Sequence, residues 1–187
     1  MSNSVLIMGG KPINIDITNI LNNYDHICRI NLNTKNKLPE NKDIFYVNNH
    51  VYIKMYKNKI EPEILKSNDY YYVNLKALKD FNNIIKNNEY CEVIEQYESG
   101  SNIISNNILE ELNCPYKFTK APRCGYQAIL YFLKKNYKVT IIGFSTENKQ
   151  NEITYYNNNK KKSIWHDINS ELKILNWLYE EEKITII

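Results

Sequence analysis

Short, mostly apolar runs recur along the chain and alternate with segments whose apolar residues have helical spacing. These runs lie at 4–8, 26–30, 44–47, 51–56, 70–75, 91–94, 138–144 and 183–187. Runs of this length, bounded by turn residues, are typical of strands that are covered on both faces, as in a parallel sheet. Their alternation with helices predicts an α/β sandwich with a largely parallel sheet.

The intervening segments predict the helices. We expect helices over 16–21, with Asp16 as N-cap, over 75–85, over 103–112 and over 125–135. The last predicted helix covers 165–179 and carries Ile168, Leu172, Leu175 and Leu178 on one face. Asn113 and Pro115 are expected to close the helix over 103–112.

Length and charge bound the classes of protein that this chain can be. Its 187 residues suit one domain over 1–187, and its net charge is only +3. The single dense basic run, Lys160 to Lys162, is short, whereas a nucleic-acid-binding surface needs a larger basic face. We read the run as a solvated loop, with attraction of an anionic substrate as the alternative.

The cysteines and the first residues indicate a cellular compartment. Four cysteines have no C-x-x-C spacing, and Cys28 and Cys91 lie in apolar runs, so buried thiols in a reducing compartment are expected. The opening MSNSVLIMGG lacks a basic lead and has only a short apolar run, so we expect neither a signal peptide nor a membrane span. A cytoplasmic protein is the resulting prediction.

Residues that follow the predicted strands are candidates for ligand binding, because ligands of open α/β sheets bind beyond the carboxyl ends of the strands. Gly9, Gly10 and Lys11 follow the first run, and glycine amides with a lysine suit a phosphate; a plain turn is the alternative. Asn31 and Asn48 follow the second and third runs, where an amide suits a sugar or base edge or simply caps a turn. Arg29, within an apolar run, is expected to be structural.

The segment Arg123-Cys124-Gly125-Tyr126 opens a predicted helix. Backbone amides at a helix N-terminus can bind an anion. A glycine there also permits close packing of the helix on the sheet, and the sequence leaves both interpretations open.

His166 lies at the start of the last predicted helix, just after a long polar segment at 146–163 that is a candidate lid. A helix N-terminus disfavours the cationic imidazole, and a neutral ring can act as a base. Glu171 does not lie directly beneath His166 at helical spacing, but it can reach a nearby backbone amide. A solvated acidic edge formed by Asp167 and Glu171 is the simpler alternative. His26 and His50 are assigned surface or packing roles.

Taken together, these segments resemble the sialyltransferases, especially glycosyltransferase family 42 and more distantly family 29. MGGKP and the later RIN resemble the nucleotide-binding motif, IFYVN the third strand, and RCGYQA followed by KVTIIGF the helix–strand motif. HDINSE resembles H-x-x-x-x-[DE], with His166 and Glu171 at its two defined positions. The sequence departs from the family at Gly10 and Lys11, within the G-N-G motif, and at Cys124, where the family has serine.

The resemblance implies a single Rossmann-like domain of the GT-A-variant type that binds CMP-sialic acid without a metal or other cofactor. It implies that His166 is the base, supported by Glu171, and that Tyr155 or Tyr156 in the lid steadies the departing phosphate. Gly9, Gly10, Lys11, Asn31, Asn48, Cys124, Gly125 and Tyr126 would hold the donor, and a glycan hydroxyl would be the acceptor. Two alternatives stay open: a non-catalytic nucleotide- or sugar-binding protein on the same scaffold, and a transferase that uses another nucleotide-sugar. The acceptor, the linkage and the oligomeric state are not specified by the sequence.

Overall fold

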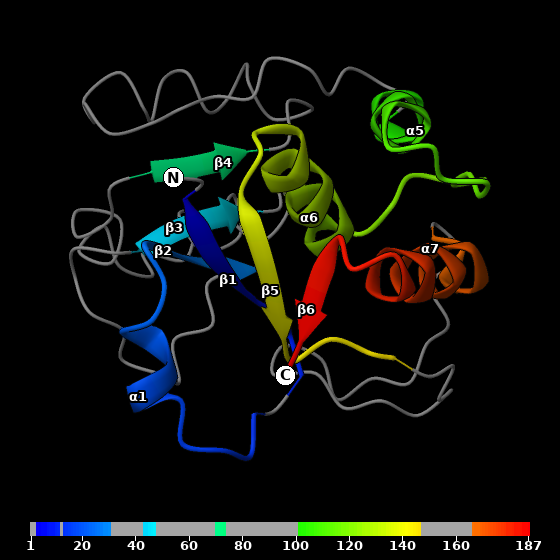
Figure 1. Cartoon of the computed structure of the whole chain (residues 1–187). Coiled ribbons are helices and arrows are strands. Elements are labelled where there is room, and N and C mark those ends of the chain that lie inside the picture. Colours follow the sequence, from blue (N-terminus) through cyan, green and yellow to red (C-terminus); the bar gives the residue numbers. More distant parts are fainter. Residues whose placement is uncertain (1–2, 12, 31–42, 48–69, 74–100, 147–165) are drawn as a thin grey trace, which may run out of the picture.

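A six-stranded parallel sheet organises the molecule (Figure 1). The computed structural model describes residues 3–11, 13–30, 43–47, 70–73, 101–146 and 166–187. The strands are β1 (Ser4–Met8), β2 (His26–Ile30), β3 (Asp43–Val47), β4 (Tyr70–Val73), β5 (Lys138–Ile142) and β6 (Ile184–Ile186). They lie in the order β4-β3-β2-β1-β5-β6, and each neighbouring pair is parallel. The prediction of an α/β fold with a mainly parallel sheet is confirmed.

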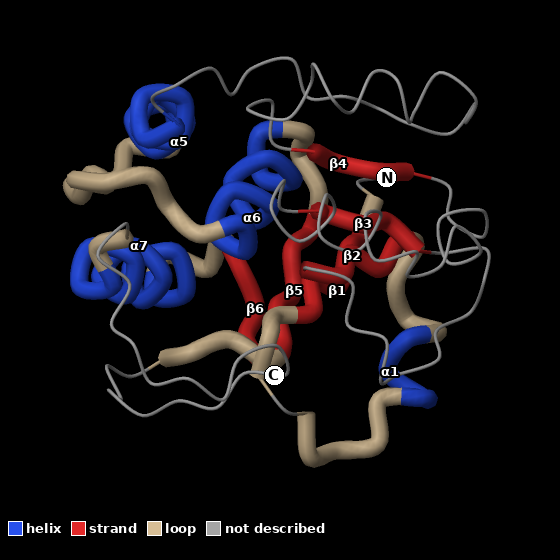
Figure 2. Tube along the Cα trace, turned by 180° about the vertical axis from the view of Figure 1, so that it is seen from behind, coloured by secondary structure: helices blue, strands red, loops and turns tan. Residues whose placement is uncertain are grey.

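Helices cover both faces of this sheet. The described helices are α1 (Thr18–Leu21), α5 (Ser101–Glu111), α6 (Cys124–Lys134) and α7 (Ile168–Glu180). In the views from the front and from behind, α5, α6 and α7 lie together, and α1 lies apart from them (Figures 1 and 2). The arrangement agrees with the two separate apolar clusters on the two faces of the sheet.

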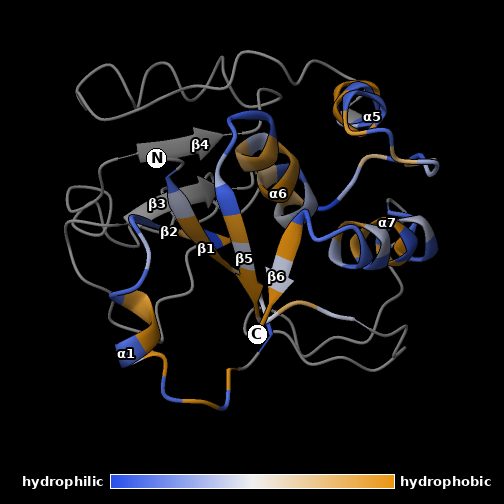
Figure 3. Ribbon diagram, viewed as in Figure 1, coloured by the Kyte–Doolittle hydropathy of each residue, from blue (hydrophilic) through white to orange (hydrophobic). Residues whose placement is uncertain are grey.

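The side chains of β1 show how the two clusters divide. Val5 and Ile7 pack in the larger cluster with apolar residues of α5, α6 and α7. Leu6 and Met8 point to the other face, where they pack with residues of the α1 segment. All four side chains are essentially inaccessible to water, as expected of a central parallel strand. Figure 3 shows the corresponding apolar colouring of β1 and of the inner sides of α6 and α7.

The three longer helices end in the same way, although glycine is scarce in this chain. Asn113, Asn136 and Glu182 follow α5, α6 and α7 with φ values of 62°, 60° and 54°. After α5, the amide of Cys114 donates to the carbonyl of Leu109, which is the long hydrogen bond of a Schellman motif. The prediction that Asn113 ends the helix is therefore confirmed, and asparagine serves where glycine is more usual.

Two predicted helix starts are wrong by a few residues. Helix α1 begins at Thr18, and its N-cap is Ile17; Asp16 accepts a hydrogen bond from the Thr18 amide at 2.9 Å without being the N-cap. Helix α7 begins at Ile168 because Asp167 supplies the N-cap, so His166 precedes the helix. The elements predicted at 51–56, 75–85 and 91–94 lie outside the described residues.

Cys28, Cys114 and Cys124 are buried as reduced thiols, which confirms the prediction for Cys28; Cys91 is not among the described residues. Burial raises the pKa of Cys114, and a hydrogen bond from the Tyr116 amide opposes that shift.

None of the helices in the described part of the chain combines the length and the apolar character that crossing a bilayer requires.

Candidate functional site

The sheet reverses its winding direction between β1 and β5. From β1 the chain builds outward through β2, β3 and β4, and it then returns to add β5 and β6 on the other side of β1. In open α/β sheets, such a switch point separates the loops at the carboxyl ends of the two central strands, and ligands bind there. The loops in question begin at Gly9, after β1, and at Gly143, after β5.

The first glycine turn is packed directly against the loop after β5. The Gly9 amide donates to the Ile142 carbonyl at 2.7 Å, and the Lys11 amide donates to the Gly143 carbonyl at 3.0 Å. A Cβ atom on Gly9 would lie 2.3 Å from the Gly143 oxygen, which is far inside contact distance. The turn therefore lies at the predicted edge, but the amides of Gly9 and Lys11 already bond to backbone and are not open to a phosphate.

The start of α6 packs on the same loop. A Cβ atom on Gly125 would lie 2.6 Å from a carbon of the Phe144 ring, and that ring also lies beside Gly9. Tyr126 is buried and makes edge-to-face contacts with Phe118 and Phe144, each at 6.3 Å between ring centroids. Cys124 is buried too. Of the two interpretations of this segment, close packing of helix on sheet is the one that these contacts support.

Glu171 is buried and supplies the cap that α6 lacks. The N-cap of α6, Arg123, makes no capping bond with its own side chain. Instead, Glu171 Oε1 accepts from the Arg123 amide at 2.7 Å, and Glu171 Oε2 accepts from Arg123 Nε at 2.6 Å. A carboxylate at this position also complements the positive end of the helix dipole. The interpretation of Glu171 as part of a solvated acidic edge is wrong; the expected contact with a nearby backbone amide is confirmed.

The surroundings of Arg123 have opposing effects on the pKa of its guanidinium. Burial acts to lower the pKa of Arg123, but the charge of Glu171 and contacts with Tyr126 outweigh it, so the pKa is raised. The guanidinium carbon lies 5.5 Å from the centroid of the Tyr126 ring, within the range of a cation–π contact. Arg123 therefore stays cationic beside Glu171 at every ordinary pH.

His166 lies just before α7 and is held by backbone rather than by Glu171. Its Nδ1 lies 2.7 Å from the Ala121 carbonyl oxygen, and the ring is half-buried. A carbonyl only accepts, so Nδ1 carries the proton in the neutral ring, and Nε2 presents its lone pair. The contact between His166 and Glu171 is thus indirect, through the segment from Ala121 to Arg123.

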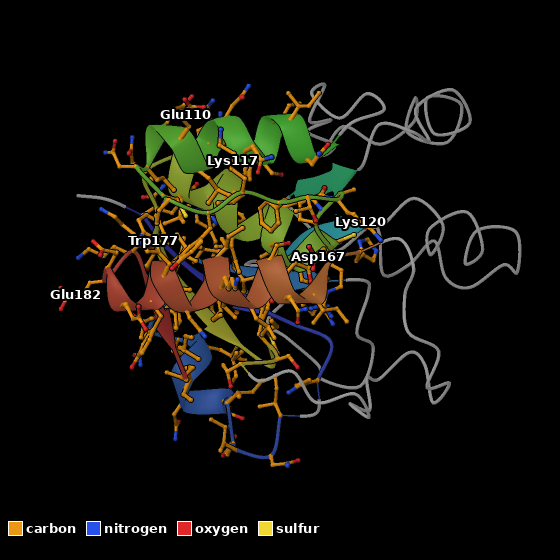
Figure 4. All side chains as sticks on the ribbon, turned by 90° about the vertical axis from the view of Figure 1, so that its right-hand side faces the viewer. Glu110, Lys117, Lys120, Asp167, Trp177 and Glu182 are labelled. Carbon is orange, nitrogen blue, oxygen red and sulfur yellow. The ribbon has the colours of Figure 1, made fainter. Side chains whose placement is uncertain are left out.

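Asp167 is a second link between the segment before α6 and the start of α7. Its carboxylate accepts from the Asn169 and Ser170 amides at 3.1 and 3.3 Å, which caps α7. It also accepts from the Thr119 hydroxyl at 2.5 Å. That hydrogen bond is the main reason why the pKa of Asp167 is lowered, and the capping amides add to the effect. Figure 4 shows Asp167 at one end of α7, with Trp177 and Glu182 toward the other.

Contacts link the glycine turn to His166. Gly9 and Gly125 both touch the Phe144 ring; Arg123, two residues before Gly125, binds Glu171; and Ala121 binds His166. Both α6 and α7 lead into strands that are parallel to β1, so their N-termini lie toward the carboxyl edge of the sheet. The structure thus connects four of the predicted elements through this series of contacts: the first glycine turn, the start of α6, Glu171 and His166.

Several predicted residues are not placed. Asn31, Asn48, Tyr155 and Tyr156 lie outside the described residues, as does the candidate lid apart from Thr146. Arg29 is buried in β2, as expected of a structural residue. His26 packs its ring on Tyr137 at 5.6 Å between centroids, as expected of a packing histidine, and His50 is not described.

Sequence reasoning missed Thr119, Ala121 and Gln127, which hold the segment before α6. Only the residues after Arg123 match a motif, and a backbone carbonyl such as that of Ala121 gives no signal in a sequence. The cap that Asp167 provides for α7 was also missed, but here the sequence does carry a signal, because an aspartate just before an apolar helical run is typical of an N-cap.

Within the described ranges, no three His, Cys, Asp or Glu side chains gather closely enough to hold a metal ion. The sequence matches no protein-family model, and no curated protein matches it.

Proposed function

We propose that this protein is a glycosyltransferase of the sialyltransferase type, which transfers sialic acid from CMP-sialic acid to a hydroxyl of a glycan. The observation that carries the proposal is the His166 ring. Its Nδ1 is bonded to the Ala121 carbonyl, and it lies in the network that leads to the glycine turn at the switch point. A neutral imidazole with one nitrogen fixed by backbone leaves the other nitrogen to accept a proton.

In the proposed reaction, Nε2 of His166 takes the proton of the acceptor hydroxyl as the hydroxyl oxygen attacks the anomeric carbon of the donor. The bond between that carbon and the phosphate oxygen breaks, and CMP leaves with the bonding electron pair. Glu171 acts on the ring only through Arg123 and Ala121, so it is a positioning residue. The family resemblance assigns the steadying of the phosphate to Tyr155 or Tyr156, whose phenols can donate a hydrogen bond to developing charge.

The sharpest test replaces His166 by asparagine, because an asparagine amide nitrogen can still donate to the Ala121 carbonyl while Nε2 is lost. We expect His166→Asn and His166→Ala to reduce turnover by about 10²–10⁴-fold, the usual contribution of a general base, with CMP affinity nearly unchanged. His26→Ala is the matched control, because that ring packs on Tyr137 and should leave turnover intact. Wild-type turnover in His166→Asn would remove His166 from the mechanism.

A non-catalytic nucleotide- or sugar-binding protein is the second candidate. It is favoured by two departures from the family motifs, Lys11 in the glycine turn and Cys124 in place of serine, where a buried thiol is a weaker hydrogen-bond donor than a hydroxyl. Measuring donor hydrolysis with and without acceptor separates the two functions, since a donor that binds and stays intact favours the binding protein.

The nucleotide is tested by thermal shift with CMP, CDP, UDP and GDP compounds. A ligand that binds the native state stabilises it by RT ln(1 + L/Kd), where L is the free ligand concentration, and so raises the melting temperature. We expect the cytidine compounds to stabilise the protein, and stabilisation by UDP compounds alone would contradict the cytidine assignment.

A further inference from the structure

The peptide between Pro122 and Arg123 is held at both of its polar ends. The Pro122 carbonyl accepts from Gln127 Nε2 at 2.6 Å, and the Arg123 amide donates to Glu171 Oε1 at 2.7 Å. Pro122, Gln127 and Glu171 are all buried, so these bonds are protected from competition by water. The plane of this peptide is therefore fixed by side chains from two helices, α6 and α7.

The preceding peptide, between Ala121 and Pro122, has no N–H group, and its one polar group is the carbonyl that meets His166. Its orientation relative to the clamped peptide depends on two angles of Pro122. The ring of proline fixes φ near −65°, and the clamped peptide fixes ψ. Because both angles are fixed, the orientation of the Ala121 carbonyl is fixed too, and the carbonyl points toward His166 Nδ1.

The geometry points to Pro122 and Gln127 as positioning residues that aim the Ala121 carbonyl at His166 and so hold the ring in the tautomer with an unprotonated Nε2. The inference rests on the proposed function for its catalytic meaning, whereas the state of the ring is a separate observable. Glu171 clamps the other end of the same peptide. Thr119, through Asp167, fastens the chain on the far side of Ala121.

The test combines two variants with one control. Pro122→Ala frees φ, and Gln127→Leu removes the donor to the Pro122 carbonyl at nearly constant volume. Pro115→Ala is the matched control, because Pro115 is exposed in the loop before α6 and loses the same ring without touching the clamp. Circular dichroism establishes that each variant is folded.

The first readout is ¹⁵N NMR of the histidine rings, at a pH where they are neutral; the chain has only three histidines to assign. In wild type we expect a protonated Nδ1 and an unprotonated Nε2 for His166. In Pro122→Ala and Gln127→Leu the two nitrogen shifts should move toward each other as both tautomers become populated, while Pro115→Ala keeps the wild-type shifts.

The second readout is steady-state transfer with CMP-sialic acid. We expect kcat to fall in both variants by up to about 100-fold, as misplacement of a catalytic group does, while KM changes little. A wild-type ring protonated at Nε2, or wild-type tautomer shifts in both variants, would overturn the inference. Absence of transfer in wild type with the expected tautomer shifts would instead overturn the proposed function and leave the positioning of the ring intact.

Discussion

At the scale of single residues, Gly9 and Gly125 both lie where the chain packs too closely for a side chain. The atoms that a side chain would meet differ between the two positions. A side chain on Gly9 would meet the Gly143 carbonyl, which is backbone held by the hydrogen bond from Lys11. A side chain on Gly125 would meet the edge of the Phe144 ring, which can rotate or shift. The space around Gly9 is therefore the less forgiving of the two.

We predict that Gly9→Ala destabilises the protein more than Gly125→Ala. For Gly9→Ala we expect a loss at or above the range of about 1–3 kcal/mol that is usual for overpacking. For Gly125→Ala, adjustment of the ring and the gain of about 1 kcal/mol in helix propensity should bring the loss below that of Gly9→Ala. Urea unfolding monitored by circular dichroism measures both free energies of unfolding, and the reverse order would contradict this account of the turn.

Single residues also show how far the site could be predicted from sequence. His166 and Glu171 stand out because histidine is rare in this chain and the spacing matches a known motif. Their actual partners, the Ala121 carbonyl and the Arg123 amide, are backbone atoms from a segment more than forty positions earlier. Side-chain patterns carry no information on such partners, so the sequence could propose His166 as the base and Glu171 as its support but not the backbone atoms that hold them.

At the scale of elements, α6 depends on α7 for its start. Arg123 has no capping side chain, and the cap comes from Glu171, whose side chain is 1% exposed. A second ion pair between helices, Lys134 with Glu111, joins α6 to α5 at 3.3 Å, with both side chains exposed. Each pair joins a basic side chain to a glutamate. Glu171 is buried and also accepts a hydrogen bond from a backbone amide, whereas Glu111 is exposed.

We predict that Glu171→Ala costs about 2–4 kcal/mol of unfolding free energy, because it leaves the partly buried Arg123 amide without its acceptor and the Arg123 guanidinium without its partner. The partial exposure of Arg123 keeps the cost toward the lower end.

Glu111→Ala is the control, and we expect a loss of no more than about 0.5 kcal/mol, as for other exposed ion pairs. Both values come from urea titrations at equal ionic strength. Equal losses in the two variants would show that Glu171 acts as an ordinary surface charge.

The errors in predicted helix starts have a common cause at this scale. Apolar periodicity places Trp165 and His166 in register with α7, but Asp167 adopts an extended backbone and caps the amides that follow. At α1, Asp16 bonds the amide of Thr18, as a cap would, while Ile17 occupies the boundary position. Periodicity fixes which face is buried, whereas the hydrogen bonds of the first turn decide where a helix begins.

At the scale of the whole molecule, the sequence predicted the fold class but could not predict the order of the strands. Short buried runs alternating with helices suffice to indicate a parallel sheet. Nothing local in the run 138–142 says that it pairs with β1 rather than with β4, the described strand that precedes it along the chain. That choice creates the switch point, so the position of the candidate site follows from long-range pairing.

Because the candidate site lies at one edge of the sheet, we predict that CMP slows amide exchange unevenly. The expected protection covers peptides that contain Gly9 to Lys11 and Thr119 to Tyr126, because a ligand stabilises the local structure that it contacts. At 100 times its Kd, CMP should slow exchange through local openings by up to about 100-fold.

The opposite edge provides the internal control, where the Lys138 amide donates to the Asn3 carbonyl at 2.9 Å. Hydrogen-exchange mass spectrometry compares the two edges in one experiment. Protection confined to peptides around Asn3 and Lys138 would place the nucleotide at the wrong end of the strands for this proposal.

The pairing of β1 with β5 has a consequence for synthesis of the chain. Ser4 to Met8 lie between β2 and β5 in the sheet, so one side of this strand lacks its neighbour until residues 138–142 have left the ribosome. An apolar strand edge that stays unpaired during synthesis can pair with the wrong segment, including strands of other nascent chains. Recruitment of a chaperone to the segment that precedes β5 would shield that edge until β5 is synthesised.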